Sequence, residues 1–214
     1  EHYDKAMVAS ADPEVAERAA GLAIAIHDNA AAQRALDRWQ VLGAKPAQMA
    51  QARAELALDH GDTDGARHQL ELLTGSGADD AWRQFGRVLV GARDQAQAAR
   101  LLEALATPQR LPNDAQAWLA MSELGDKFGR HAYAVRIADA AAQRFKNAET
   151  YAWAAQMKFK DGDRNGARDL LQKALARQPK NARLRLAYAS VLSETGDYAG
   201  ASRLLEHGPQ DADI

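Results

Sequence analysis

One phrase occurs twice in this sequence at a distance of 34 residues. The stretches KDGDRNGARDLL (160–171) and ETGDYAGASRLL (194–205) share Gly-Asp, two variable residues, Gly-Ala, two more residues and Leu-Leu. Four weaker versions precede them at spacings of 32 to 36 residues, and self-similarity at this period is typical of a stack of small units. The six equivalent turn positions are His27, Gly61, Arg93, Gly129, Gly162 and Gly196.

Each unit has the pattern of a helical hairpin. Apolar or small residues recur three and four positions apart before each turn, which is the spacing of a helical stripe. A glycine at the turn can end the first helix in the left-handed conformation. The aspartate that follows it in five units can cap the second helix. The alanine five residues after every turn predicts a close crossing of the two helices: Ala32, Ala66, Ala98, Ala134, Ala167 and Ala201.

The composition agrees with a helical protein. Alanine, the best helix former, supplies much of the 47% hydrophobic content, while aromatic residues make up 6%. The absence of cysteine excludes disulfides and a thiolate nucleophile. No apolar run approaches the length of a membrane span. Since the sequence begins without an initiator methionine or a leader, we expect an excised or processed fragment.

These units resemble the tetratricopeptide repeat. In that family Trp, Leu, Gly and Tyr mark the first helix, Ala and an aromatic residue mark the second, and Pro closes the unit. The resemblance implies an all-α fold, a right-handed α-solenoid of about six helical hairpins plus an N-terminal helix. The matching residues are Trp82, Gln84, Phe85, Gly86, Leu89, Trp118, Tyr151, Ala167, Ala174 and Pro179.

The repeat register sets the expected boundaries. We expect an N-terminal helix over 1–12, the repeat array over 13–209 and an acidic tail over 210–214. The loops 74–80 and 106–114 are longer, but the register resumes after each, so we expect them to alter the superhelical pitch without separating domains. The expected units lie near 13–46, 47–79, 80–112, 115–147, 148–179 and 182–209.

The N-terminal hairpin has a narrower resemblance, to the tetratricopeptide lipoproteins of Gram-negative bacteria. Members of that group are outer-membrane-anchored adaptors that scaffold a periplasmic carboxy-terminal processing protease. The resemblance implies the periplasmic side of the outer membrane, with the lipid anchor outside this chain; the alternative compartment is the cytoplasm. The matching residues are Asp12, Pro13, Val15, Ala16, Glu17, Arg18, Ala19 and Ala20.

The tetratricopeptide resemblance implies a concave groove lined by the first helices, which binds a peptide segment or a partner protein. Positions 2, 5, 9 and 12 of each first helix lie on one helical stripe facing that groove. Arg83 and Arg87 lie one turn apart and can grip a carboxylate or carbonyl groups. The alternative is that they pair with Glu55 and Glu123 on adjacent helices. The expected peptide-binding residues are Gln48, Gln51, Glu55, Arg83, Arg87, Gln116, Glu123, Gln156 and Phe159.

Enzymatic chemistry is not expected from these residues. The histidines include no pair at a metal-ligand spacing, and no phosphate-binding loop follows a strand. Asp161 and Asp163 flank a turn glycine and are expected to cap helices, while His27 and His131 are expected to be surface residues of turns. We therefore expect no catalytic residue, no metal and no cofactor.

Two functional hypotheses remain besides the adaptor. Residues 127–185 carry 14 Lys or Arg against 5 Asp or Glu, a surplus that a polyanion-binding scaffold for exopolysaccharide export or nucleic acid would use. We rank nucleic acid below a protein partner, because these basic residues can instead solvate the second helices. The other alternative is the recognition arm of a larger enzyme whose catalytic domain lies outside this chain.

Overall fold

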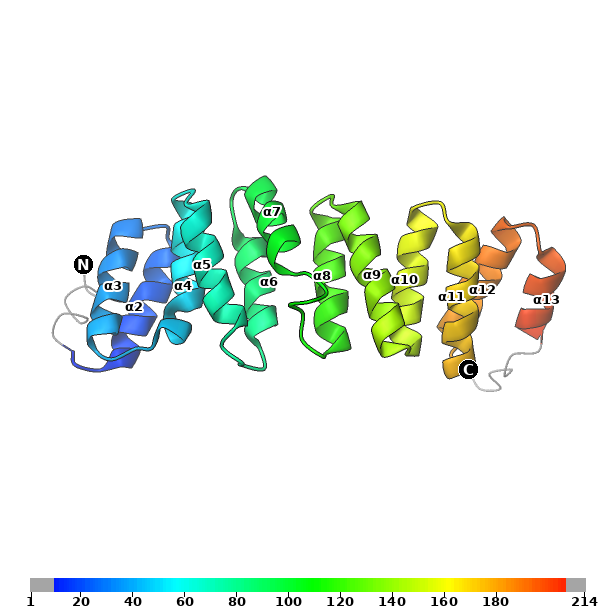
Figure 1. Ribbon diagram of the computed structural model, residues 1–214, viewed down its shortest axis with the longest axis horizontal. Coiled ribbons are helices and arrows are strands. Elements are labelled where there is room, and N and C mark those ends of the chain that lie inside the picture. The colour runs from blue at the N-terminus through cyan, green and yellow to red at the C-terminus, as the bar shows by residue number, and fades with distance from the viewer. Residues whose placement is uncertain (1–9, 207–214) are drawn as a thin grey trace. The chain divides into compact units, whose positions relative to one another are not determined.

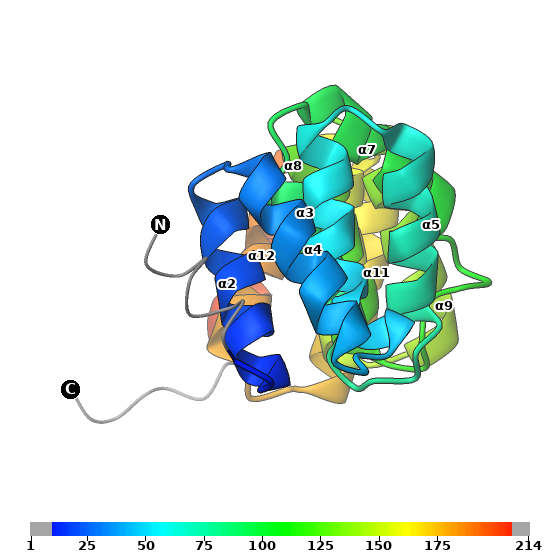
Figure 2. The ribbon, with the colours of Figure 1, turned by 90° about the vertical axis from the view of Figure 1, so that its left-hand side faces the viewer.

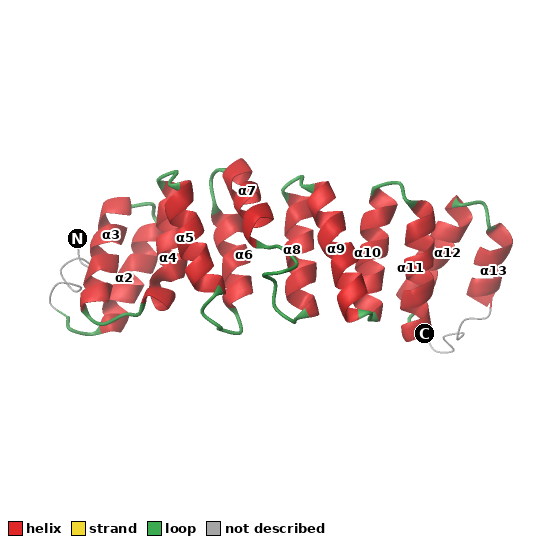
Figure 3. Ribbon diagram, in the orientation of Figure 1, coloured by secondary structure: helices red, strands yellow, loops and turns green. Residues whose placement is uncertain are grey.

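The computed structural model describes residues 10–206, which fold into twelve α-helices. Within this range the helices are joined by turns and loops, and no strand occurs (Figures 1 and 3). The chain divides into two compact units, residues 1–106 and 107–214, called here the N-terminal and C-terminal units. The boundary falls in the loop 106–114, so a single array across this loop stays a prediction.

The N-terminal unit contains three successive helical hairpins. Within each, the two helices pack against one another, and first helices also contact the first helices of neighbouring hairpins. Figure 2 views this unit along the stack from the side of its first hairpin. The hairpins are α2 (Pro13–Ala25) with α3 (Asn29–Val41), α4 (Pro46–Asp59) with α5 (Thr63–Thr74), and α6 (Ala81–Gly91) with α7 (Gln95–Leu105).

The C-terminal unit also contains three successive helical hairpins. Hairpin packs on hairpin through contacts of α9 with α10 and of α11 with α12. The hairpins are α8 (Ala115–Lys127) with α9 (His131–Phe145), α10 (Ala148–Lys160) with α11 (Arg164–Arg177), and α12 (Ala182–Glu194) with α13 (Tyr198–Glu206).

Turn chemistry explains why the repeated phrase contains Gly-Asp. The turn glycines of four hairpins have positive φ, for example +85° at Gly162, a conformation that costs glycine little. The aspartate that follows accepts a hydrogen bond from a free backbone N–H of the next helix. These N-cap bonds join Asp28 Oδ1 to Ala31 N (2.9 Å), Asp62 Oδ1 to Gly65 N (2.9 Å), Asp94 Oδ1 to Gln97 N (2.9 Å), Asp163 Oδ1 to Gly166 N (2.8 Å) and Asp197 Oδ1 to Gly200 N (2.8 Å).

The second glycine of the phrase also has a packing reason. A Cβ at Gly166 would overlap the capping carboxylate of Asp163, and Gly65 and Gly200 stand in the same relation to their own caps. The alanine that follows lies at the helix crossing: five of the six recurrent alanines have an exposed fraction of 0%, and the sixth, Ala201, of 6%. Larger side chains there would push the two helices of a hairpin apart.

The described residues include only a small part of the expected N-terminal helix and none of the expected acidic tail. Residues 10–12 precede α2 without helical structure, and Asp12 caps that helix by accepting from the backbone N–H of Glu14 at 2.9 Å. Residues 1–9, where most of the expected N-terminal helix falls, lie outside the described residues. The expected tail, 210–214, lies outside them too.

Candidate functional site

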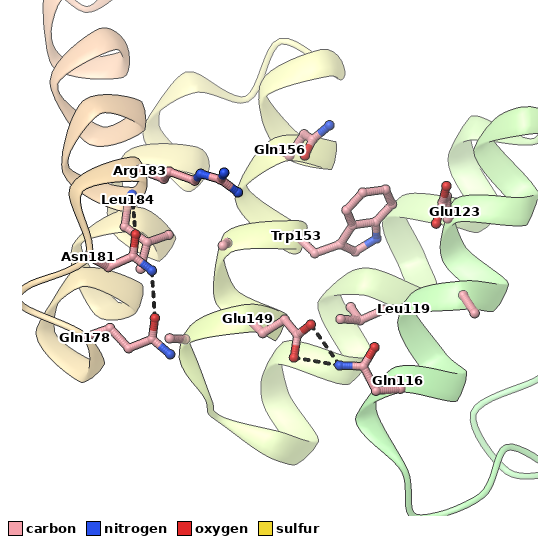
Figure 4. Close-up of a pocket in the computed structure, with 13 residues that line it drawn as sticks. Gln116, Leu119, Glu123, Glu149, Trp153, Gln156, Gln178, Asn181, Arg183 and Leu184 are labelled. Carbon is pink, nitrogen blue, oxygen red and sulfur yellow. Dashed lines mark hydrogen bonds between the residues drawn. The ribbon is translucent and has the colours of Figure 1, made fainter.

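The first helices of the C-terminal unit surround a cavity of about 680 Å³, called here the polar cavity (Figure 4). Three elements supply its walls: α8, α10 and the start of α12 with the loop before it. Its lining combines amides, carboxylates, one indole and one guanidinium, besides small apolar residues. The lining residues with functional groups are Gln116, Glu123, Glu149, Trp153, Gln156, Gln178, Asn181 and Arg183.

Side-chain hydrogen bonds hold two pairs of these residues in place. The Gln116 amide Nε2 donates to both carboxylate oxygens of Glu149, each at 2.8 Å, and so joins α8 to α10. On the opposite wall, Asn181 Nδ2 donates to Gln178 Oε1 at 2.8 Å. Asn181 Oδ1 also accepts from the backbone N–H of Leu184 at 3.1 Å and caps α12. Intramolecular hydrogen bonds therefore hold side chains on both walls of the cavity.

Trp153 is fixed in the middle of α10 with its ring at the cavity. Its indole Nε1 donates to Ser122 Oγ at 2.9 Å, and that hydroxyl donates to the carbonyl of Ala134 at 2.7 Å. The ring is half-buried, so one end lies in the core while the rest borders the cavity (Figure 4). An indole held in this way offers a flat apolar surface of constant orientation.

A second recess, called here the apolar cavity, lies next to the polar one. Its volume is about 400 Å³, and it is lined chiefly by Ala155, Phe159, Leu171, Ala187 and Val191. The two cavities share four lining residues: Ala152, Gln156, Arg183 and Leu184. Together they form one recess along α10 and α12, polar toward α8 and apolar toward the end of α10.

The structure brings several expected groove residues together here. Gln116, Glu123 and Gln156 line the polar cavity, and Phe159 lines the apolar one. The prediction of binding residues did not include Trp153, Gln178 or Asn181. Trp153 lies one position off the predicted stripe, and the other two come from the turn that returns to α12, which a pattern on first helices does not cover.

In the N-terminal unit the expected residues are more dispersed. Gln48 Oε1 accepts from the backbone N–H of Lys45 at 2.7 Å and so caps α4. Gln51 Nε2 donates to Glu55 Oε1 at 2.9 Å. Glu55 and Arg87 line a small cavity of about 200 Å³, while Arg83 is exposed on α6.

Within the described residues of the N-terminal unit, the part of the alternative ion-pair ladder that involves Glu55 is not formed. Neither Arg83 nor Arg87 has a recorded ion pair with Glu55, whose carboxylate accepts from Gln51. Glu123 pairs within its own helix, with Lys127 Nζ at 3.0 Å from Glu123 Oε1. Arg83 and Arg87 are thus available to a ligand.

His27 is an exposed turn residue, as expected, but its backbone and its ring are also constrained. It takes the place of a turn glycine with a φ of +56°, and its Nδ1 lies 2.8 Å from Asp59 Oδ2. Arg93 Nε lies 3.7 Å from the other oxygen of that carboxylate. One aspartate of α4 therefore connects the turns of the hairpins before and after it.

A similar cluster joins two hairpins of the C-terminal unit. Asp126 Oδ2 accepts from Lys160 Nζ at 2.6 Å, and Asp126 Oδ1 lies 3.0 Å from His131 Nδ1. These contacts, the lysine first, lower the pKa of Asp126. Asp161 is the C-cap residue of α10, in line with the expected capping role, and its Oδ1 lies 3.7 Å from His131 Nε2. Asp126 thus lies among the residues of the turns, where it connects the two hairpins.

Many basic residues between 127 and 185 have intramolecular partners. The guanidinium of Arg144 lies over the ring of Trp118 at 5.8 Å, and that of Arg136 over Tyr133 at 5.4 Å. Arg164 Nε lies 3.7 Å from Glu194 Oε2. Lys158 Nζ lies 3.0 Å from Asp139, and this contact above all raises the pKa of the lysine. Part of the cationic surplus is therefore balanced within the fold.

Within 10–206 no group of three or more His, Cys, Asp or Glu side chains is placed to hold a metal ion. None of the helices in the same range has the length and apolar character that crossing a membrane requires.

Comparisons with known proteins agree on the repeat. A family model described as "Tetratricopeptide repeat" matches residues 158–213. Among solved structures, "MamA 41-end from Desulfovibrio magneticus RS-1" is 15% identical, with 76% of this chain and 93% of that chain covered and a TM-score of 0.50. A structure titled "Crystal structure of MamA protein" is 13% identical, with coverages of 75% and 88% and a TM-score of 0.50. No curated protein matches the sequence.

These likenesses establish the fold. The predicted class is confirmed: an all-α chain whose helices pack as antiparallel hairpins, as in a tetratricopeptide-like solenoid. None of the comparisons supports the narrower likeness to protease-adaptor lipoproteins.

Proposed function

We propose that this protein is a non-catalytic scaffold that holds an extended peptide segment of a partner protein in the recess of its C-terminal unit. The observation that carries this proposal is the junction of the polar and apolar cavities, which share Gln156 and Arg183. An extended segment offers a backbone N–H and C=O at every residue and a side chain on each side. The recess offers amide groups that can bond to the peptide backbone and an apolar site that can take a peptide side chain.

The polar groups suit a peptide backbone for a physical reason. The amide of Gln156 can both donate and accept, so it can pair with either backbone group. Gln116, Asn181 and Trp153 already have fixed positions through their intramolecular hydrogen bonds. Binding therefore orders few side chains, which lowers the entropic cost of association.

Arg83 and Arg87 of the N-terminal unit are proposed as a second contact, to a carboxylate or to carbonyl groups of the partner. Gln48, Gln51 and Glu55 belong to the same proposed surface, but their side chains already have partners within α4 or at its start. We therefore assign the second contact mainly to the arginines.

Selection of displayed peptides on the whole chain tests the main proposal. Exposed alanines line each cavity, Ala120 the polar one and Ala187 the apolar one, so Ala120→Trp and Ala187→Trp fill the recess without replacing a core residue. Each is expected to weaken the selected peptides at least about tenfold, because a filled pocket removes the buried contacts on which affinity depends. Ala176→Trp, at an exposed alanine of α11, is the matched control. Peptides that bind all three variants equally would refute binding in the recess.

A narrower form of the proposal is an adaptor for a periplasmic carboxy-terminal processing protease, anchored through a lipid outside this chain. It is supported by the likeness of residues 12–20. Several of these residues also have structural roles, since Asp12 caps α2 while Ala16, Ala19 and Ala20 are buried. The coding sequence upstream tests this form: a lipoprotein signal supports it, and an uninterrupted cytoplasmic protein refutes it.

Polyanion binding is the second candidate function. Lys146 and Lys173 line a recess of about 420 Å³ between the second helices α9 and α11, within the basic range 127–185. Binding of this kind weakens steeply with salt because counterions are released. Chromatography on immobilised heparin tests this candidate. Retention of the wild-type protein at roughly 50 mM salt, lost in the variant with Lys146→Gln and Lys173→Gln, would support polyanion binding. If the wild-type protein is not retained at this salt concentration, polyanion binding is refuted.

A further inference from the structure

The polar cavity has an acidic corner formed by Glu123, Glu149 and Trp153. In Figure 4 the two carboxylates lie on either side of the Trp153 ring. Glu149 accepts two hydrogen bonds, both from the neutral amide of Gln116 at 2.8 Å. Among residues 107–206 no cationic group pairs with Glu149, so its charge is not balanced within the unit.

This lack of a cation contrasts with several other carboxylates of the same unit. Asp126, Asp139 and Glu194 each have a lysine or arginine partner, and Asp163 caps a helix. Glu149 lies in the first turn of α10, where the helix N-terminus favours a negative charge. That position explains why the charge is tolerated. The hydrogen bond from Gln116 holds the carboxylate at the cavity wall.

Trp153 adds a second reason for a cation to bind there. The face of an indole attracts ammonium and guanidinium groups through its quadrupole, most strongly where water is partly excluded. The hydrogen bonds from Trp153 to Ser122 and from Ser122 to the Ala134 carbonyl keep the ring in place. Glu123 contributes further negative charge, although Lys127 partly neutralises it at 3.0 Å.

We propose that this corner binds the side chain of a lysine or arginine in the peptide ligand, while a nearby large aliphatic side chain enters the apolar cavity. This inference rests on the proposed function and names the class of peptide that the recess selects. Arg183, on the α12 side, has no recorded ion pair among the described residues and repels a cation from that wall. The opposite charges of the two sides therefore fix the direction in which a basic peptide lies.

Calorimetric titration of the whole chain with short capped peptides tests the proposal. The probes are acetyl-Gly-X-Ala-Leu-Gly-amide and the same peptide with one residue more or less between X and Leu, where X is Lys, Arg, Gln or Glu. Lys and Arg probes are expected to bind about five- to tenfold more tightly than the Gln probe, and the Glu probe most weakly. This preference should decrease with added salt.

Matched variants assign the preference to the acidic corner. Glu149→Gln is expected to bring the Lys probe within about twofold of the Gln probe, because it removes the unbalanced charge. Asp169→Asn makes the same change of net charge on α11, at the recess between the second helices, and should keep the preference. Glu123→Gln, at an exposed position of α8, is the second variant if the fold of Glu149→Gln is disturbed.

The outcomes separate this inference from the function on which it rests. If neither these probes nor displayed peptides bind the recess, the proposed function fails and the inference fails with it. If peptides bind there but Lys and Arg give no advantage, only the inference is overturned. It is also overturned if the advantage survives both Glu149→Gln and Glu123→Gln.

Discussion

The aspartates that follow the turns connect sequence to structure at the residue scale. Each carries out a local task, the capping of one helix, with a partner three residues away. Local tasks of this kind leave a short pattern in the sequence, which is why the capping role could be predicted. Trp153 is the opposite case, because its orientation depends on Ser122, 31 residues earlier in the chain. No short pattern records that contact.

Asp163→Ala is expected to lower the free energy of unfolding by about 1 kcal/mol at neutral pH, through loss of the N-cap of α11. The hydrogen bond from the Gly166 backbone N–H is the main cause that lowers the pKa of Asp163. A lowered pKa in the folded state gives stability that is present above the unfolded pKa of about 4 and is lost as the pH falls through the folded value.

Urea unfolding of the wild type and of Asp163→Ala at pH 7 and near pH 2 checks both points. The difference between the two proteins should narrow at the lower pH. Asp169→Ala, at an exposed position of the same helix, is the control and should change stability by less than about 0.5 kcal/mol. A difference that is independent of pH would contradict the assigned cause.

At the scale of the element, small residues decide how closely helices pack. Gly125 of α8 faces Tyr133 of α9, and a Cβ there would lie 2.5 Å from the ring carbon Cδ1. Glycine is otherwise unfavourable inside a helix. The close approach of the two helices of this hairpin is therefore the reason for its presence.

Gly125→Ala is expected to destabilise the protein by about 1–2 kcal/mol, since the clash with Tyr133 exceeds the gain in helix propensity. Gly21→Ala is the matched control, because a Cβ at Gly21 of α2 meets nothing within 4 Å. The control should stabilise the protein by about 0.5–1 kcal/mol. Thermal unfolding of both variants measures whether each substitution raises or lowers the stability of the protein. If both substitutions change the stability in the same direction, packing at Gly125 is not the deciding factor.

Charged groups at the turns connect successive hairpins at the same scale. Asp126 and Lys160 belong to different hairpins and lie 2.6 Å apart. A double-mutant cycle with Asp126→Asn and Lys160→Gln is expected to give a coupling free energy of about 0.5–1 kcal/mol at low salt. Because the pKa of Asp126 is lowered in the folded protein, the coupling should be present at neutral pH and disappear in acid. A coupling of zero would mean that this ion pair does not help to join the two hairpins.

At the scale of the whole molecule, the sequence predicts architecture better than recognition. The repeated turns and alanines predict helical hairpins because every unit must solve the same packing problem. Gln116, Glu123 and Gln156 could be assigned to one surface from the tetratricopeptide resemblance together with helical spacing, and they line one cavity. Gln178 and Asn181 could not, because the path of the chain between α11 and α12 decides where they lie. The division into two units near residue 106 likewise depends on contacts that the register does not record.

The central claim is that a peptide binds in the recess of the C-terminal unit, and the indole of Trp153 reports on it directly. The protein has four tryptophans, of which Trp39, Trp82 and Trp118 have exposed fractions of 7%, 9% and 2%. In an NMR titration of the nitrogen-15-labelled chain with a selected peptide, the indole N–H signal of Trp153, assigned with Trp153→Phe, should shift saturably while the other three remain in place. Saturable binding that leaves the Trp153 signal unchanged would contradict the account.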